Sequence, residues 1–301
     1  MRFPTLPAVG VLSLCTAVAV TGCQAAAPEQ ASHSTAAITI ATIPLGDDPT
    51  QANPIEAFAD LLEAETGRTV EVTDVPDYLS VVEAIRGDHV DIGIMSGFPS
   101  ALAVNTGEVD SLMAWAGSDA PVSTCVVLDG SPVQQLEDLR GKTVAFADQA
   151  SSSGYFMPVY MLHEAGLKKG EDYEAIFAGG HDGSFAALKQ GQVDAACTAV
   201  MLTELGSPMF PFSEGEWRGI GKSPAMDVMG SVLSRQSLDT ETRQLLQEAL
   251  PKVFSEKNAE ALGALGKGFI GLDEIMDPEP AIFDSFAEIA AVADVKLEDL
   301  G

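Results

Sequence analysis

Three consecutive serines followed by a glycine form the stretch whose residue types and spacing could do chemistry: Ser151, Ser152, Ser153 and Gly154, here called the serine loop. The loop follows a short apolar run, residues 143–147, that predicts a buried strand. Over residues 156–163 the apolar side chains recur every three or four positions, which predicts a helix. The free N–H groups and the dipole at a helix start favour a bound anion. One serine would suffice to cap the helix, so an ordinary cap is the alternative to an oxyanion site.

A histidine lies about thirty residues further along, again just after a predicted strand. His181 stands in the sequence AGGHDGS, which follows the strand expected at residues 173–177. An imidazole can donate a hydrogen bond to an oxyanion, although a lone histidine more often has a structural role. We expect His181 in a loop, with Asp182 and Ser184 capping the helix of residues 183–189.

These two motifs resemble those of the phosphonate- and phosphite-type (PhnD-like) solute-binding proteins of ABC importers. Residues 138–167 match a pattern of D-L-[KR]-G-K, a strand, S-[ST]-S-G-Y and a helix ending in L-x-x-x-G. Residues 178–196 match G-[GS]-H-D-x-S, x-A-L and x-G-x-V-D-A. The resemblance covers about residues 38–250. It implies a type II periplasmic-binding-protein fold of the α/β class, with two Rossmann-like lobes joined by a two-strand hinge.

The resemblance also implies a binding site between the lobes. The three residues Ser151, Ser152 and Ser153 of the serine loop would hold the ligand's oxygens, and His181 would donate from the same lobe. Tyr78, at the end of the second predicted strand, and Ser100 would close on the ligand from the other lobe. A half-buried aromatic residue that covers the sheet edge is the alternative for Tyr78.

The chain departs from the family's pattern in two places. Residues 95–100 (MSGFPS) stand where relatives have F-G-P-x-S-Y, so that Ser100 replaces a pocket tyrosine. Asp227 lies near the family's P-x-D-P motif, but the second proline is missing. Its carboxylate would accept a hydrogen bond from a protonated ligand oxygen or from an ammonium group, and an exposed hinge carboxylate is the alternative. A binding protein for a sulfonate, nitrate or pyrimidine therefore stays open beside one for a phosphonate, phosphite or related oxyanion.

Sequence motifs of common enzyme classes are missing from the chain. It has no G-x-S-x-G elbow, no H-E-x-x-H and no Walker motif, and its four histidines are scattered. No set of residues has the spacing of metal ligands. We therefore expect a binding protein without cofactor or metal, and a clamshell-fold enzyme acting on a small molecule is the alternative.

Alternating strands and helices must position these residues. Strands are expected at residues 38–43, 69–73, 90–95, 114–116, 123–128, 143–147, 173–177, 193–198 and 226–233, and further helices at 53–66, 77–86, 238–254 and 280–292. This alternation predicts parallel sheets with helices on their faces and ligands at the carboxyl ends of the strands. In the first lobe those ends are residues 44–48, 75–78 and 96–100.

The lobe boundaries follow from two expected crossovers, near Thr124 and near Met226. Lobe 1 then spans residues 38–123, lobe 2 spans residues 124–225, and residues 226–301 return to lobe 1 with C-terminal helices. Closing the hinge would exclude water from a ligand and strengthen every dipole aimed at it.

The first 37 residues predict export. The apolar run at residues 9–20 is too short to span a bilayer and fits a signal peptide. The sequence VTGC that ends at Cys23 resembles a bacterial lipobox, so residues 1–22 would be a lipoprotein signal peptide and Cys23 the lipidated residue. Residues 23–37 have the composition of a flexible tether. We expect an extracytoplasmic protein that is lipid-anchored to the bacterial cell membrane, and an ordinary secretory signal is the alternative.

An excess of acidic residues, 44 against 16 basic ones, gives a formal net charge of −28. Such a surface repels nucleic acid and anionic membranes. An anionic ligand is still compatible with it, because a buried site can bind through dipoles. The expected partners are a small oxyanion and ABC permease subunits, and the protein is expected to be a monomer.

Four cysteines are present, and two of them, Cys15 and Cys23, lie in the N-terminal segment. Cys125 and Cys197 remain, and an even pair in an exported protein can form a disulfide. In the implied fold the strands that carry them can be neighbours. A disulfide and two buried free thiols both stay open.

Overall fold

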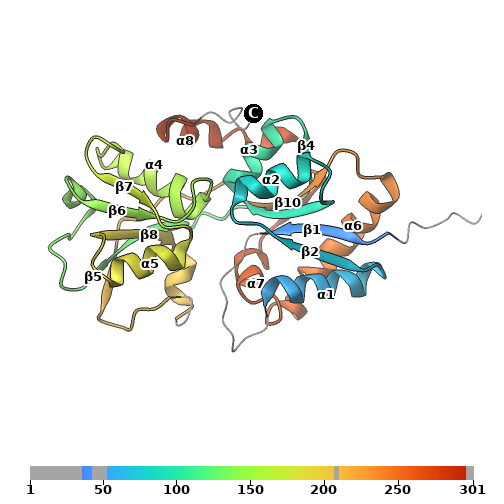
Figure 1. The fold of residues 1–301 in the computed structure, drawn as a ribbon, viewed down its shortest axis with the longest axis horizontal. Helices are drawn as coiled ribbons and strands as arrows, with labels where there is room; N and C mark the ends of the chain where they lie inside the picture. Colours follow the sequence, from blue (N-terminus) through green and yellow to red (C-terminus); the bar gives the residue numbers. More distant parts are fainter. Residues whose placement is uncertain (1–35, 43–52, 207–209, 296–301) are drawn as a thin grey trace, which may run out of the picture. The chain divides into compact units, whose positions relative to one another are not determined.

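The computed structural model describes residues 36–42, 53–206 and 210–295 of the chain. The predicted signal peptide, Cys23, most of the predicted tether and the loop of residues 44–48 lie outside these ranges. The described residues contain two mixed sheets, and helices cover both faces of each sheet (Figure 1). This arrangement confirms the predicted two-lobed α/β fold.

Lobe 1 is built on a six-stranded sheet in the order β11-β4-β10-β3-β1-β2. Its strands are β1 (Ile38–Thr42), β2 (Val70–Asp74), β3 (Ile92–Ser96), β4 (Val109–Ala116), β10 (Val228–Arg235) and β11 (Glu274–Met276). Strand β1 pairs in parallel with β2 and β3, whereas β10 runs antiparallel to β3 and β4. The two faces are covered by α2 (Tyr78–Arg86) with α3 (Gly97–Asn105), and by α1 (Pro54–Thr66) with α6 (Thr240–Val253) and α7 (Gly263–Phe269).

Lobe 2 is built on a five-stranded sheet in the order β7-β6-β8-β5-β9. Its strands are β5 (Ser123–Leu128), β6 (Thr143–Phe146), β7 (Glu174–Phe177), β8 (Ala195–Ala199) and β9 (Trp217–Ile220). Strand β6 is parallel to β7 and β8, and β5 is antiparallel to β8 and β9. Helices α4 (Met157–Glu164) and α5 (His181–Lys189) lie on opposite faces (Figure 1). A short π-helix, Ser152–Phe156, joins β6 to α4.

Two neighbouring segments, residues 117–122 and 221–227, connect the lobes. The Gly117 N–H donates to the carbonyl oxygen of Asp227 at 2.7 Å. A Cβ at Gly117 would overlap the carbonyl oxygen of Met226, so the two connections approach as closely as they do because residue 117 is glycine. Both segments lie close to the crossovers that the sequence predicts.

Local signals determine where the first helix begins and ends. The Asn53 side chain accepts a hydrogen bond from the Ile55 N–H at 2.9 Å, and Pro54 takes the first helical position, where no N–H is needed. Gly67, with φ of 68°, ends the helix in the left-handed conformation. Asp77 caps α2 in the same way as Asn53 caps α1. Each of these four residues lies at the helix end that it helps to determine.

An apolar core runs from lobe 1 into lobe 2. Phe98 of α3 stacks on Phe156 of the π-helix with ring centroids 3.4 Å apart, and it meets Phe286 edge-on at 5.4 Å. All three rings are buried. Separate cores lie on the α1 and α6 face of the first sheet and on the α5 face of the second. Packing therefore joins the lobes in this conformation, in addition to the two chain connections.

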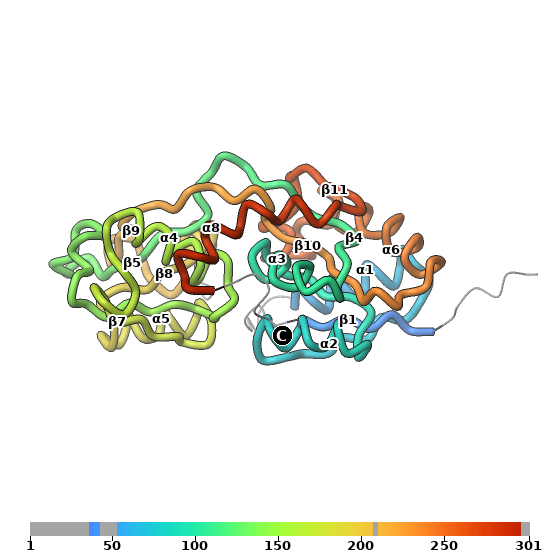
Figure 2. Tube along the Cα trace, turned by 90° about the horizontal axis from the view of Figure 1, so that it is seen from above, coloured from blue at the N-terminus to red at the C-terminus, as the bar shows by residue number. Residues whose placement is uncertain are grey.

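The C-terminal segment, residues 280–295, contacts both lobes. Phe283 lies in a 3₁₀ turn that packs on α3 of lobe 1, and α8 (Phe286–Val292) packs beside α4 of lobe 2 (Figure 2). The Lys169 Nζ donates to the carbonyl oxygen of Ala293 at 3.1 Å. The predicted single outer helix is thus a turn and a short helix that bridge the lobes.

Several short elements differ from the sequence prediction. Helices α3 and α7 and strands β9 and β11 occupy stretches for which no element was predicted. The predicted start of α5 was wrong, because the helix begins at His181 and not at Gly183. Gly180 is the N-cap residue, and the Ser184 hydroxyl donates to its carbonyl oxygen at 3.0 Å, so Ser184 lies inside the helix. No described helix is both long and apolar enough to cross a membrane.

Candidate functional site

The serine loop lies at the carboxyl end of β6 and leads into the π-helix and α4. Ser151 caps this helical segment, because its Oγ accepts from the Gly154 N–H at 3.0 Å. Ser152 is fully buried and Ser153 is half-buried. A Cβ at Gly154 would lie 2.5 Å from the Cβ of Ala147, so the close approach of loop and strand requires glycine. The cap that the sequence offered as an alternative is therefore present, and it uses one serine of the three.

The Ser152 hydroxyl reaches across to lobe 1. The Phe98 N–H donates to the Ser152 Oγ at 2.8 Å, and the Ser152 hydroxyl donates to the Ser96 Oγ at 2.9 Å. Ser96 is the N-cap residue of α3 and makes no side-chain cap bond, so the Phe98 N–H is one of the free N–H groups at that helix start. Two helix starts, one from each lobe, therefore meet at one oxygen atom.

Tyr78 and Asp148 stand beside this contact, one from each lobe. Tyr78 is the first residue of α2, is half-buried, and its hydroxyl interacts with the Ser96 side chain. Burial raises the pKa of Tyr78, the Ser96 interaction lowers it, and the Asp148 carboxylate raises it further. Burial also raises the pKa of Asp148, although the Ala150 N–H that donates to it at 2.7 Å acts in the opposite direction. The Tyr78 hydroxyl is thus a protonated donor where the lobes meet.

His181 faces the serine loop from the start of α5. Its Cε1 lies 2.9 Å from the position that a Cβ at Gly154 would take. Its Nδ1 is 2.9 Å from the Oγ1 of Thr198, a fully buried residue of β8. Burial lowers the pKa of His181 to about 4, with Asp182 acting in the opposite direction. The imidazole is therefore neutral at neutral pH and carries its single N–H on one of its two nitrogens.

Ser100 is not placed as the resemblance implies. It is fully buried one turn inside α3, where its hydroxyl donates to the Ser96 carbonyl oxygen at 2.9 Å and lies 3.3 Å from that of Met95. A serine inside a helix commonly forms this bond to the preceding turn. Its single proton is used there, so the expectation that Ser100 donates to a ligand is corrected. The lobe 1 hydroxyl at the site is instead that of Ser96, the N-cap residue of α3, which accepts from the Ser152 hydroxyl.

Asp227 lies in the second connection between the lobes and is exposed. Its carbonyl oxygen takes part in the hinge, whereas its carboxylate makes no hydrogen bond or ion pair within the described part of the chain. It occupies the exposed hinge position that the sequence gave as its alternative. Its role as an acceptor for a ligand stays a prediction.

Cys125 and Cys197 face each other in neighbouring strands and form a disulfide. Both are fully buried, and the bond links β5 to β8 directly before Thr198. Of the two states that the sequence left open, the structure has the disulfide. Among the described residues, no group of three or more His, Cys, Asp or Glu side chains could hold a metal ion.

Three residues of the site were not predicted: Ser96, Asp148 and Thr198. Ser96 lies at a strand end that the sequence marks as a place for ligands. Asp148 lies three residues before Ser151, and Thr198 is the one hydroxyl residue in the strand sequence AACTA. Their contacts with Tyr78 and His181 come from distant segments, which no local pattern reveals.

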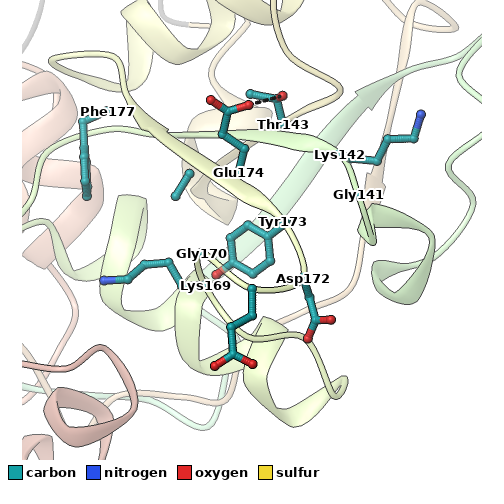
Figure 3. Close-up of a pocket in the computed structure, with 11 residues that line it drawn as sticks. Gly141, Lys142, Thr143, Lys169, Gly170, Asp172, Tyr173, Glu174 and Phe177 are labelled. Carbon is teal, nitrogen blue, oxygen red and sulfur yellow. Dashed lines mark hydrogen bonds between the residues drawn. The ribbon is translucent and has the colours of Figure 1, made fainter.

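A separate cavity of about 580 Å³ opens at the β7 edge of the second sheet (Figure 3). It is lined by residues 141–143, 169–175 and 177, with basic and acidic side chains both present. None of the predicted ligand-binding residues lines it. We therefore place the candidate site at the serine loop, where free N–H groups and hydroxyls of both lobes meet.

Comparison with known sequences gives a family match over most of the chain. A sequence profile described as "ABC transporter, phosphonate, periplasmic substrate-binding protein" matches residues 40–278. The chain is 27% identical over 272 residues to the Phosphate-import protein PhnD of Mycolicibacterium smegmatis, which covers 83% of this chain and 84% of that protein. It is 26% identical over 174 residues to the Phosphonates-binding periplasmic protein of Escherichia coli, which covers 56% of this chain and 52% of that protein.

Comparison with solved structures gives the same architecture. PhnD1 from Prochlorococcus marinus, solved in complex with methylphosphonate, superposes with a TM-score of 0.69 over 86% of this chain and 98% of that one. The two sequences are 18% identical. At this identity the likeness shows the fold, which is that of a two-lobed binding protein.

Proposed function

Because the chain belongs to the family of periplasmic substrate-binding proteins of phosphonate ABC transporters, we propose that it captures a phosphorus oxyanion between its two lobes. The proposed ligand is a phosphonate, phosphite or related oxyanion. Relatives named for phosphate import and for phosphonate binding support this class. The family consists of transport proteins, which confirms the prediction that the chain is not an enzyme.

One observation carries the proposal: the Ser152 oxygen accepts from the free Phe98 N–H at the start of α3. An oxyanion oxygen bears more negative charge than a hydroxyl oxygen and forms a stronger bond with such an N–H. The start of the π-helix and α4 offers further N–H groups from lobe 2. In the proposal the ligand's oxygens enter between these helix starts, and the Ser152 hydroxyl turns to donate to them.

Other residues complete the donor set in this proposal. The Tyr78 hydroxyl donates from lobe 1, and the half-buried Ser153 and the neutral His181 donate from lobe 2. The Asp227 carboxylate would accept from a protonated oxygen or from the ammonium group of an aminophosphonate. These donors are neutral dipoles, so binding depends on excluding water from them.

The hinge supplies that exclusion. The lobes are joined by residues 117–122 and 221–227, and rotation about such paired connections opens and closes a site between lobes. Each lobe alone would leave the bound anion in water. In the closed form each dipole acts at lower effective dielectric, and the permease subunits receive a surface that differs from that of the open form.

We further propose that Cys23 is lipidated and that the protein is an anchored monomer which delivers its ligand to ABC permease subunits. The apolar run of residues 9–20 and the VTGC sequence support the anchor. A Cys23→Ser variant expressed in a lipoprotein-processing host should leave the membrane fraction and appear in the soluble one. Retention of that variant in the membrane fraction would contradict the anchor.

A thermal-shift panel on the purified protein tests the ligand class. The panel contains phosphite, methylphosphonate, 2-aminoethylphosphonate, phosphate, sulfate and a small alkanesulfonate. A compound that binds only the folded state raises the melting temperature. We expect a rise with at least one phosphorus compound and no rise with sulfate. A rise with the sulfonate alone, or no rise with any compound, would overturn the proposal.

A further inference from the structure

Thr198 is a polar, fully buried residue of the second sheet. It lies in β8, whose sequence AACTA contains no other hydroxyl, and it is 0% exposed. A buried hydroxyl without a partner is costly. Its partner is the Nδ1 of His181, at 2.9 Å from the Thr198 Oγ1. The contact joins the sheet to the first residue of α5.

The imidazole of His181 lies between this hydroxyl and the serine loop. Its Cε1 faces Gly154, 2.9 Å from the position that a Cβ there would take. Its Nε2 makes no hydrogen bond with any residue in the described part of the chain. One ring nitrogen is thus tied to the sheet, and the other is available to a ligand.

The location of the imidazole proton decides whether Nε2 can bind an anion. Because burial lowers the pKa of His181, the ring is neutral and has one proton at neutral pH. With the proton on Nε2 the nitrogen donates to an oxyanion, whereas with the proton on Nδ1 the lone pair of Nε2 repels it.

We propose that Thr198 is a positioning residue whose hydroxyl donates to His181 Nδ1 and thereby keeps the imidazole proton on Nε2, which faces the oxyanion. The ligand part of this inference rests on the proposed function. The tautomer part concerns this chain's own residues and can be tested by itself.

The sheet holds the Thr198 hydroxyl in place. Thr198 pairs with Thr124 across β8 and β5, and the disulfide between Cys125 and Cys197 joins the same two strands one residue away. Strand β8 also pairs with β6 on its other side. The strand, which has neighbours on both sides, keeps the Thr198 Oγ1 within hydrogen-bond distance of Nδ1, where the hydroxyl can donate to an unprotonated Nδ1.

Two variants separate the hydroxyl from the shape of the side chain. Thr198→Val keeps the branched shape and removes the hydroxyl, and Thr198→Ser keeps the hydroxyl. Long-range ¹H–¹⁵N correlation spectra report the tautomer of His181, whose signals a His181→Gln variant assigns among the four histidines. Calorimetric titration with methylphosphonate and with phosphate reports the affinity.

In the wild type and in Thr198→Ser we expect the Nε2–H tautomer of His181, and in Thr198→Val a mixture or the Nδ1–H form. We expect Thr198→Val to weaken binding by about tenfold, as for the loss of one hydrogen bond to a charged group, and Thr198→Ser to restore it to within about threefold. The Nδ1–H tautomer in the wild type would overturn the inference even if Thr198→Val failed to fold.

Unchanged affinity and tautomer in Thr198→Val would overturn it as well. A wild type that binds no phosphorus compound but shows the Nε2–H tautomer, lost in Thr198→Val and kept in Thr198→Ser, would overturn the proposed function and support the positioning role. The two failures are therefore distinguishable.

Discussion

Each lobe brings a strand that runs into a helix start to the candidate site, and the two starts are built differently. In lobe 1, β3 ends at Ser96 and α3 begins at Gly97 without a side-chain cap. In lobe 2, β6 is followed by the serine loop, in which Ser151 caps the Gly154 N–H. The start of α3 has no side-chain cap, and its Phe98 N–H donates instead to the Ser152 Oγ of lobe 2.

Each helix start contains a tightly packed glycine, Gly97 in lobe 1 and Gly154 in lobe 2, but the two glycines pack against different kinds of group. A Cβ at Gly97 would overlap the carbonyl oxygen of Val228 and would lie 2.8 Å from the Phe286 ring. Val228 is the first residue of β10 and directly follows the connection of residues 221–227. A Cβ at Gly154 would meet the side chains of Ala147 and His181. The lobe 1 start is therefore tied to the hinge and to the C-terminal segment, and the lobe 2 start is tied to a donor side chain. Changes at the first should alter stability, and changes at the second should alter affinity.

The largest effect is expected from Gly97→Ala. The added methyl group would overlap a backbone oxygen, which cannot move as a flexible side chain can. We expect the free energy of unfolding to fall by about 3 kcal/mol or more, measured by urea denaturation. Gly130→Ala is the control, since nothing lies within 4 Å of its added Cβ. Equal stability of the two variants would contradict the close packing of the α3 start against the hinge.

Removal of the disulfide should be the next largest effect. The bond between Cys125 and Cys197 closes a loop with a sequence separation of 72 residues. Cys125→Ala with Cys197→Ala should therefore lower the free energy of unfolding by about 2–4 kcal/mol. The wild type measured with and without reductant provides the control. A double variant as stable as the oxidised protein would show that the lobe 2 sheet holds its position without the bond.

Ser152→Ala and Ser100→Ala compare a hydroxyl at the lobe 2 helix start with one that lies a turn inside the lobe 1 helix. Loss of the Ser152 hydroxyl should weaken phosphonate binding by about 10- to 100-fold, because a hydrogen bond to a charged group contributes about 1.5–3 kcal/mol. Ser100→Ala should change the affinity by less than about threefold, because its hydroxyl is bound inside α3. Titration calorimetry measures the phosphonate affinity of both variants. A larger loss in Ser100→Ala than in Ser152→Ala would reverse the assignment.

The smallest effect is expected from the titration of His181. Its pKa is about 4 in the folded protein against an ordinary value of 6.5, so between these values the unfolded chain binds more protons. The free energy of unfolding should therefore rise with pH through this window, by roughly 1–2 kcal/mol between about pH 5 and 7 from this group. His181→Gln should lose that part of the slope in denaturation curves, and the exposed His163→Gln should keep it. Identical slopes in both variants would show that His181 is not held neutral by burial.

Local patterns in the sequence were sufficient for the framework of the fold. The strand and helix alternation, the Asn53 cap and the Gly67 stop depend on neighbouring residues, and all are present in the structure. The short β9 and β11 were missed, because a strand of three or four residues exists through its partner and has little periodicity of its own. The start of α5 was misplaced because His181 gave no capping signal and Gly180 took that position.

The site was harder to predict than the fold. The serine loop and His181 lie near each other as expected, because both follow parallel strands of one sheet. Ser100 was expected at the end of the third strand and near the ligand, whereas it lies inside α3 with its hydroxyl bound to the Ser96 carbonyl oxygen. The contacts of Ser96 with Ser152, and of Thr198 with His181, join residues far apart in the chain. Such contacts depend on how the lobes and strands pack, so no local pattern could indicate them.

The bridging position of residues 280–295 bears on how the protein is made. These residues are synthesised after both lobes, so the apolar surfaces of α3 and α4 that Phe283 and α8 cover stay open while the rest of the chain emerges from the ribosome. The contact between Lys169 and Ala293 forms only when almost all of the described chain has been translated. A fold that is completed so late remains unfinished during synthesis, which suits a chain that has to cross a membrane before it matures.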